Sequence, residues 1–103
     1  MTAARLLPAE SGRWELSGVL DFTTVTHLAE EGMRLLRKVP DRGRVAIDLS
    51  GVELANSAGL ALLLEWLEMA QTRDIQLSYR RLPDSLRRIA AFSNLQDLLP
   101  TGH

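Results

Sequence analysis

The chain has 103 residues, 46% of them hydrophobic and 24% charged, which is ordinary for a globular protein with one hydrophobic core. Its net charge of -1 leaves no basic excess for binding nucleic acid, and the lack of cysteine excludes disulfides, thiolate catalysis and zinc–thiolate sites. No apolar run approaches the roughly 20 residues that cross a bilayer. We therefore expect one domain over residues 1–103, cytoplasmic and reaching a membrane only through partners.

The first 20 residues predict a β-hairpin. Residues 3–8 form a candidate edge strand, because Pro8 lacks the N–H group that a central strand needs. Ser11 and Gly12 are a turn signal, and residues 13–19 then alternate polar with apolar side chains, as a half-buried strand does.

Residues 23–38 predict the first helix. Capping side chains precede it, and its apolar residues follow an approximately helical spacing: Val25, Leu28, Gly32, Leu35, Leu36 and Val39. His27 lies on this helix with no cysteine or second histidine nearby to complete a metal site. We interpret His27 as a solvated residue and expect neither a metal nor another cofactor.

The middle of the chain combines a buried strand, a polar turn and the most apolar helix. Residues 45–49 predict the strand and residues 50–59 the turn. The helix that follows has leucines at helical spacing: Leu60, Leu63, Leu64 and Leu67. A second apolar stripe, formed by Leu62, Trp66 and Met69, is more than one sheet face needs. Either a neighbouring helix covers this stripe, or it is a protein-binding surface, where Trp and Met are enriched.

Asn56 and Ser57 stand where the N-cap of this helix belongs. One interpretation is that one of them accepts a hydrogen bond from the first free backbone N–H groups. The other is that the Ser57 hydroxyl is exposed at the positive end of the helix dipole, where a phosphate would be electrostatically favoured. The two interpretations are compatible.

The last third of the chain predicts a strand over residues 75–80, a helix from 83 to 93 and a short final helical turn over 95–100. The predicted order is therefore β, β, α, β, α, β, α. Strands that alternate with helices favour an α/β fold, in which helices cover a sheet.

Three segments resemble the signatures of the STAS family: Leu-Ser-Gly-Val-Leu-Asp at 16–21, Asp-Leu-Ser-Gly-Val at 48–52 and Asn-Ser-Ala-Gly-Leu at 56–60. The resemblance extends over about residues 13 to 100. It implies a single STAS domain, with a small mixed sheet of four to five strands covered by about four helices.

Two branches of that family are similar to this chain. Anti-sigma-factor antagonists carry Asp-Ser-Ser/Thr-Gly-Leu-Gly at this turn, and a partner kinase phosphorylates the first hydroxyl residue. Here Ser57 matches the hydroxyl position, but Asn56 replaces the Asp and Ala61 replaces the last Gly. Residues 59–64 and 89–100 are more similar to the STAS subunit of a phospholipid-transport ABC system.

The transporter resemblance implies a non-catalytic protein that binds the ATPase subunit of an inner-membrane ABC transporter. The complex would contain permease and lipid-binding subunits and would maintain the lipid asymmetry of the outer membrane. The expected partner contacts are residues of the turn and of the helix behind it: Asn56, Ser57, Ala58, Leu62 and Trp66. The alternative is an anti-sigma-factor antagonist that is switched by phosphorylation of Ser57.

An enzyme is the least supported class. Ser57, His27 and Asp48 are the residue types of a hydrolytic triad, but the sequence has no G-x-S-x-G elbow and His27 lies on a different predicted helix. Neither a G-x-x-x-x-G-K-[ST] loop nor a G-x-G-x-x-G loop is present for a nucleotide.

Overall fold

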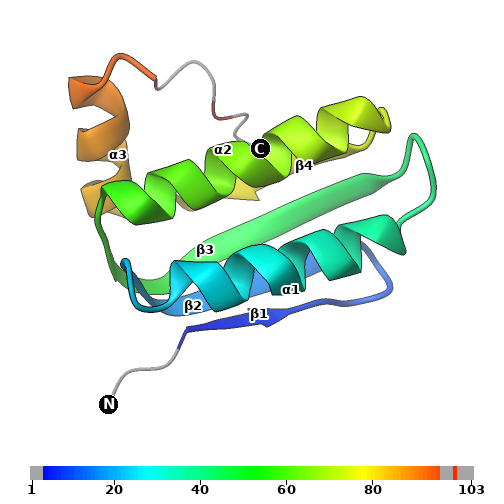
Figure 1. Cartoon of the computed structure of the whole chain (residues 1–103), viewed down its shortest axis with the longest axis horizontal. Helices are drawn as coiled ribbons and strands as arrows, with labels where there is room; N and C mark the ends of the chain where they lie inside the picture. Colours follow the sequence, from blue (N-terminus) through cyan, green and yellow to red (C-terminus); the bar gives the residue numbers. More distant parts are fainter. Residues whose placement is uncertain (1–3, 96–98, 100–103) are drawn as a thin grey trace.

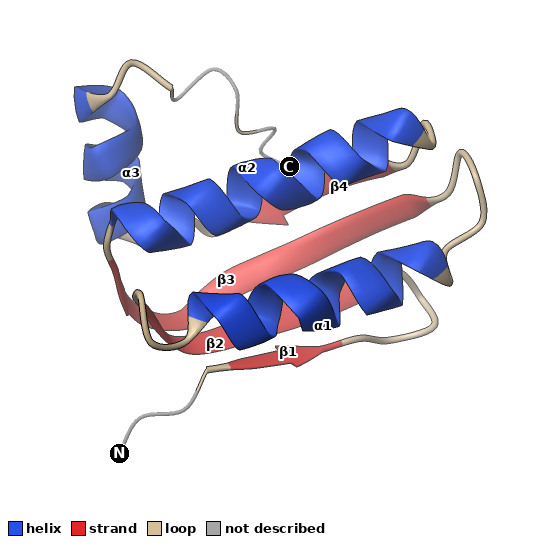
Figure 2. Cartoon of the chain, viewed as in Figure 1, coloured by secondary structure: helices blue, strands red, loops and turns tan. Residues whose placement is uncertain are grey.

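The computed structural model describes residues 4–95 and Leu99 and forms a mixed α/β fold. The elements in chain order are β1 (Arg5–Leu7), β2 (Arg13–Leu20), α1 (Val25–Arg37), β3 (Arg44–Ala55), α2 (Ser57–Thr72), β4 (Gln76–Arg80) and α3 (Asp84–Phe92) (Figure 2). This order confirms the sequence prediction. The helical turn predicted for 95–100 lies largely outside the described residues.

The four strands form one sheet in the order β1-β2-β3-β4. β1 and β2 are the predicted antiparallel hairpin, whereas β2 with β3 and β3 with β4 are parallel pairs. A helix connects the strands of each parallel pair. Because such crossovers are right-handed, α1 and α2 lie side by side on one face of the sheet, and α3 packs at the end where α2 begins (Figure 1).

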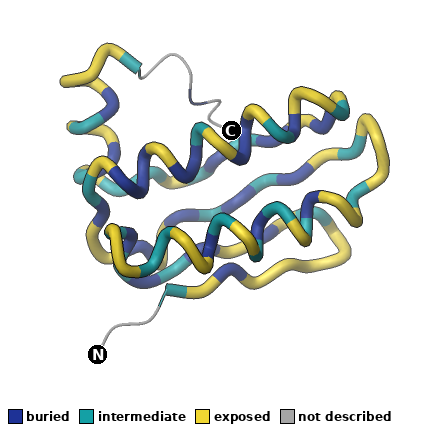
Figure 3. The backbone as a smooth tube through the Cα atoms, in the orientation of Figure 1, coloured by how far each residue is buried: buried dark blue, intermediate teal, exposed yellow. Residues whose placement is uncertain are grey.

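Alternation along the strands separates a buried face from an open one. Buried and exposed residues alternate along the strands (Figure 3). The buried side chains form the core with the helices: Leu6, Trp14, Leu16, Val45, Ile47, Leu49, Leu77 and Tyr79. Each contributes about 1.5–3 kcal/mol relative to exposure. The opposite face carries mainly polar and small residues, and no helix of the described chain covers it.

β3 is longer than the sequence indicates. The predicted turn over residues 50–59 was wrong in its first part, because the strand continues to Ala55. Two register shifts against β2 accommodate the extra residues, and Gly51 lies so close to β2 that a Cβ there would be 2.8 Å from the Cβ of Ser17. Ser50 and Gly51 therefore form an irregularity within the sheet, not a turn at its end.

The indole of Trp66 fixes the distance between α1 and α2. Trp66 is fully buried, and a Cβ built on Gly32 of α1 would lie 2.2 Å from its Nε1. The indole N–H has no hydrogen-bond partner among the described residues, so packing holds this side chain. On the sheet side of α2, the Tyr79 hydroxyl donates a 2.6 Å hydrogen bond to the carbonyl oxygen of Leu63. Burial raises the pKa of Tyr79 well above its ordinary value, which keeps this donor protonated.

We predict that Gly32→Ala lowers the free energy of unfolding by about 1–3 kcal/mol, because Trp66 has no free space into which to move. The helix propensity of Ala acts in the opposite direction by about 0.5–1 kcal/mol, so the sign of the change tests the contact. Urea unfolding followed by circular dichroism measures it, with Glu30→Ala on the exposed face of α1 as the control. A Gly32→Ala protein as stable as the wild type would contradict the prediction.

Candidate functional site

Ser57 lies at the carboxyl ends of the parallel strands, as the first residue of α2. The backbone N–H of Asn56 donates to the carbonyl oxygen of Leu20 at 3.1 Å, which ties the end of β3 to the end of β2. The N–H of Ala55 donates to the Ser85 hydroxyl of α3 at 3.2 Å. Bonds to two elements, β2 and α3, thus hold the chain just before Ser57 in place.

Asn56 is the N-cap of α2. Its side-chain oxygen accepts a 2.9 Å hydrogen bond from the N–H of Ala58, and its backbone is extended, as at an N-cap. The Ser57 side chain is exposed, and its hydroxyl forms no hydrogen bond to the part of the chain that the structure describes. The first turn of α2 contains no acidic residue. The positive end of the helix dipole is therefore not neutralised there, and Ser57 presents a free hydroxyl beside it.

Small residues bring the start of α2 against the sheet. A Cβ on Gly59 would lie 2.9 Å from the Cβ of Leu20, so only Gly allows this approach. Ala58 is buried as well, so it presents only a small part of its surface to a partner. Ala58 therefore supports the site without being an exposed contact.

The loop between β2 and α1 forms the neighbouring wall. The N–H and hydroxyl groups of Thr23 both donate to Oδ1 of Asp21, at 2.9 and 2.6 Å. These bonds hold the pKa of Asp21 below its ordinary value. The Thr24 hydroxyl donates to the carbonyl oxygen of Val19 at 2.8 Å and fixes the loop to β2. Phe22 is turned outward from this ordered loop and is 73% exposed.

A shallow groove of about 440 Å³ lies between the first halves of α1 and α2. Phe22, Ala29, Ala58, Ala61, Leu62 and Glu65 are among the residues that line it. Leu54, 59% exposed, lies three residues before Ser57 but faces the open side of the sheet, because its neighbour Ala55 is buried on the helix side. Phe22 was not among the residues that the sequence indicated for this site. The sequence sign of an exposed Phe22 is that it stands among capping residues and belongs to none of the predicted apolar stripes.

Leu62 and Trp66, two of the expected partner contacts, have almost no exposed surface. Trp66 is fully buried and Leu62 is 2% exposed, because α1 covers the second apolar stripe of α2. Leu62 still lines the groove, whereas Trp66 lies in the core. Of the two interpretations of that stripe, cover by a neighbouring helix is the one that the structure supports.

The remaining candidate residues are not brought together. His27 is exposed on α1 and lines a small hollow with β1. Asp48 is on the open sheet face, where it accepts a hydrogen bond from the N–H of Ser50 at 2.9 Å and pairs with Arg81. Burial acts to raise the pKa of Asp48, but the Ser50 hydrogen bonds and Arg81 outweigh it and lower this pKa. Among the described residues, no hydrogen bond joins Ser57, His27 and Asp48.

Two negative findings apply to the described residues alone. They contain no group of three or more His, Cys, Asp or Glu side chains placed to hold a metal ion. In the same part of the chain, none of the helices combines the length and apolar character needed to span a membrane.

Comparison with known proteins agrees with this architecture. A family model described as "Mlab, STAS domain" matches residues 5–100. The chain therefore belongs to the STAS family. Within it, the matching model is that of the MlaB type. No curated protein matches the sequence.

Three solved structures are similar in fold. An anti-sigma factor antagonist from Mycobacterium paratuberculosis has a TM-score of 0.76 at 21% identity, covering 98% of this chain and 85% of the other. The anti-sigma factor antagonist SpoIIAA in its unphosphorylated form has a TM-score of 0.74 at 14% identity, covering 98% of this chain and 89% of the other. The MlaB subunit in the Acinetobacter MlaFEDB complex, in its ATP-bound Vtrans2 conformation, has a TM-score of 0.75 at 23% identity. The match covers 87% of this chain and 93% of the other.

We predict that Asn56→Ala lowers the free energy of unfolding by about 1 kcal/mol, because it removes the cap of α2. Ser57→Ala should change it by less than about 0.5 kcal/mol, since the hydroxyl is exposed. Asn56→Asp should retain stability, because a carboxylate accepts the same hydrogen bond beside the positive helix end. Urea unfolding of the three variants measures these changes, and equal losses in Asn56→Ala and Ser57→Ala would contradict the assignment of the cap.

Proposed function

We propose that this protein is the STAS subunit of an ABC lipid transporter and that it binds the transporter's ATPase subunit. The observation that carries the proposal is the match of the MlaB-type family model to residues 5–100. The likeness in fold to a chain of the MlaFEDB complex supports it. The complex would include permease and lipid-binding subunits, and the protein would lie on the cytoplasmic side of the inner membrane, held there by its partners.

The proposed contact surface is centred on Ser57. Exposed Phe22 and the groove between α1 and α2 supply apolar area, and Glu65 supplies part of a polar rim. Protein interfaces have this arrangement, with aromatic side chains toward the centre and charges at the edge. Asn56 and Ala58 belong to the contact surface only as supports, since they fix the position of Ser57. Contact there would remove the Ser57 hydroxyl from water.

The mechanism follows from binding alone. The protein contributes no catalytic group and needs no cofactor in this proposal. It supports the ATPase by binding one conformation more tightly than another, because a partner shifts an equilibrium only through such a difference in affinity. Lipid asymmetry of the outer membrane is then maintained by the transporter, with this subunit setting how much of the ATPase is in the active assembly.

A second function is favoured by a specific observation. The free Ser57 hydroxyl stands at a helix end that has no acidic neighbour in its first turn, where a phosphate is favoured. The fold is also similar to two anti-sigma-factor antagonists. In this alternative the partner is a small serine kinase, and phosphorylation of Ser57 ends the interaction.

Affinity purification separates the two functions. The tagged protein is purified gently from the membrane fraction of its own cells and washed with salt, and the retained proteins are identified by mass spectrometry. We expect an ABC ATPase together with its permease. Recovery of a small soluble kinase in their place would establish the alternative and contradict the transporter proposal.

We predict that Ser57→Asp weakens binding to the ATPase at least about tenfold, because an unpaired carboxylate would be desolvated in the contact. The same Asp favours the folded state, since it lies at the positive end of α2, so lost binding cannot be attributed to unfolding. Purified complexes, titrated by calorimetry and assayed for ATP hydrolysis, measure the effect. Phe22→Ala should also weaken binding, whereas Glu68→Ala, exposed near the other end of α2, should not. Unchanged binding and ATPase activity in Ser57→Asp would refute this contact.

A further inference from the structure

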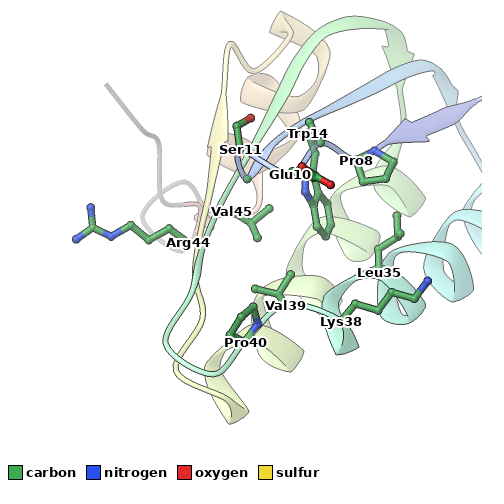
Figure 4. Close-up of a pocket in the computed structure, with 12 residues that line it drawn as sticks. Pro8, Glu10, Ser11, Trp14, Leu35, Lys38, Val39, Pro40, Arg44 and Val45 are labelled. Carbon is green, nitrogen blue, oxygen red and sulfur yellow. The ribbon is translucent and has the colours of Figure 1, made fainter.

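A second hollow lies at the opposite end of the sheet from Ser57. It has a volume of about 510 Å³ and lies between the end of α1, the loop after β1 and the start of β3 (Figure 4). Its apolar lining includes Trp14, Leu35, Val39, Pro40 and Val45. Pockets that bury small apolar ligands have volumes of about 300–1,000 Å³ and a mainly apolar lining.

This apolar hollow continues into a basic one on the open face of the sheet. The basic hollow measures about 440 Å³, and Arg13, Arg44, Gln76 and Ser78 are among its lining residues. The two hollows share a set of residues: Ser11, Gly12, Arg44 and Val45. Alternation along β3 explains the change of character, because Val45 faces the helices and Arg44 faces away from the apolar hollow (Figure 4).

The wall between the two hollows is preformed. The N–H of Ala46 donates a 2.8 Å hydrogen bond to the carbonyl oxygen of Gly12, which pins the loop to β3. Gly12 has a φ of +81°, and a Cβ there would lie 2.6 Å from the carbonyl oxygen of Arg44. Only glycine fits this approach without strain. A ligand would therefore not have to order this segment of the chain when it binds.

The charges at this end favour an anion on the Arg44 side. Arg13 and Arg44 are exposed on the same face of neighbouring strands, and neither forms an ion pair within the described chain. Arg73 binds the carbonyl oxygens of Leu36 and Val39, so the negative end of α1 is already compensated. Glu10 is the single carboxylate among the described residues lining the two hollows, and it lies on the apolar one together with Lys38.

We propose that this end of the protein binds an anionic single-chain amphiphile. The acyl chain occupies the apolar hollow against Trp14 and Val39, and the headgroup lies against Arg44 and Arg13. The two arginines set the orientation, because they carry a net positive charge on the open face, whereas Glu10 and Lys38 have opposite charges on the apolar hollow. A fatty-acid carboxylate and the phosphate of a lysophospholipid share the required chemistry. The site is separate from the proposed contact at Ser57, which lies beyond the other end of β3.

The experiment uses the fluorescence of Trp14 in the full chain. Dibromostearate, whose bromine atoms quench indole fluorescence at short range, is titrated below its critical micelle concentration. Lysophosphatidylglycerol and a monoacylglycerol then compete as unbrominated probes. We expect saturable quenching that is lost in Trp14→Phe, because Trp66 is buried beneath α1. The anionic competitor should displace the probe and the neutral one should not. The relative affinities of the two anionic probes distinguish a carboxylate ligand from a phosphate ligand.

Matched variants test the headgroup position. The double variant Arg13→Ala with Arg44→Ala should weaken binding about tenfold, the loss expected for one charge-assisted contact. Glu10→Gln should strengthen binding, and Arg87→Ala with Arg88→Ala, on α3, should leave it unchanged. Circular dichroism verifies that each variant is folded, which is expected because all these side chains are exposed. The proposal is overturned if neither anionic probe binds saturably, if the monoacylglycerol competes equally, or if the double arginine variant binds as the wild type does.

Discussion

The contact between Trp66 and Gly32 is the constraint on which the helical layer depends. A side chain of any size at position 32 would occupy the space of the indole, so the missing Cβ lets α1 lie directly against α2. This spacing determines the groove beside Ser57, since the groove is lined by the same two helices one turn nearer their starts. It also explains the composition of α2. α2 packs against the sheet on one side and against α1 on an adjacent side, so it is apolar over most of its circumference.

The exposure of Ser57 results from a division of roles among its neighbours. Asn56 supplies the cap, so the Ser57 hydroxyl is not needed to satisfy the free N–H groups of α2. Gly59 brings the next turn onto β2, and the bonds from Asn56 and Ala55 fix the chain before the helix. The result is a hydroxyl on a rigid support beside an uncompensated helix dipole. Such a support suits both a protein contact and a phosphate acceptor, which is why the fold alone does not choose between the two proposed functions.

The sequence predicts the order of elements, the hairpin and the position of the candidate site, because periodicity and capping residues are local signals. The sequence does not predict the features that depend on packing between distant parts of the chain. Ser50 and Gly51 have the composition of a turn, yet pairing with β2 keeps them in the strand. Trp66 has the spacing of a surface stripe, and only the partner glycine on a distant helix shows that it is core. Phe22 belongs to no periodic pattern, so its exposure beside the start of α2 becomes visible only when the loop after β2 is placed in space.

α1 contributes to both the groove beside Ser57 and the apolar hollow at the other end of the sheet. Its first turns line the groove beside Ser57, and its last turn and the residues after it line the apolar hollow at the other end of the sheet. Gly32 lies between these regions, and the buried indole of Trp66 fixes its position. A close-packed core transmits small shifts because it contains little free volume. A ligand that displaced α1 at one end would therefore strain the Trp66 contact before it reached the other, and the stiffness of that contact decides how far the two surfaces act independently.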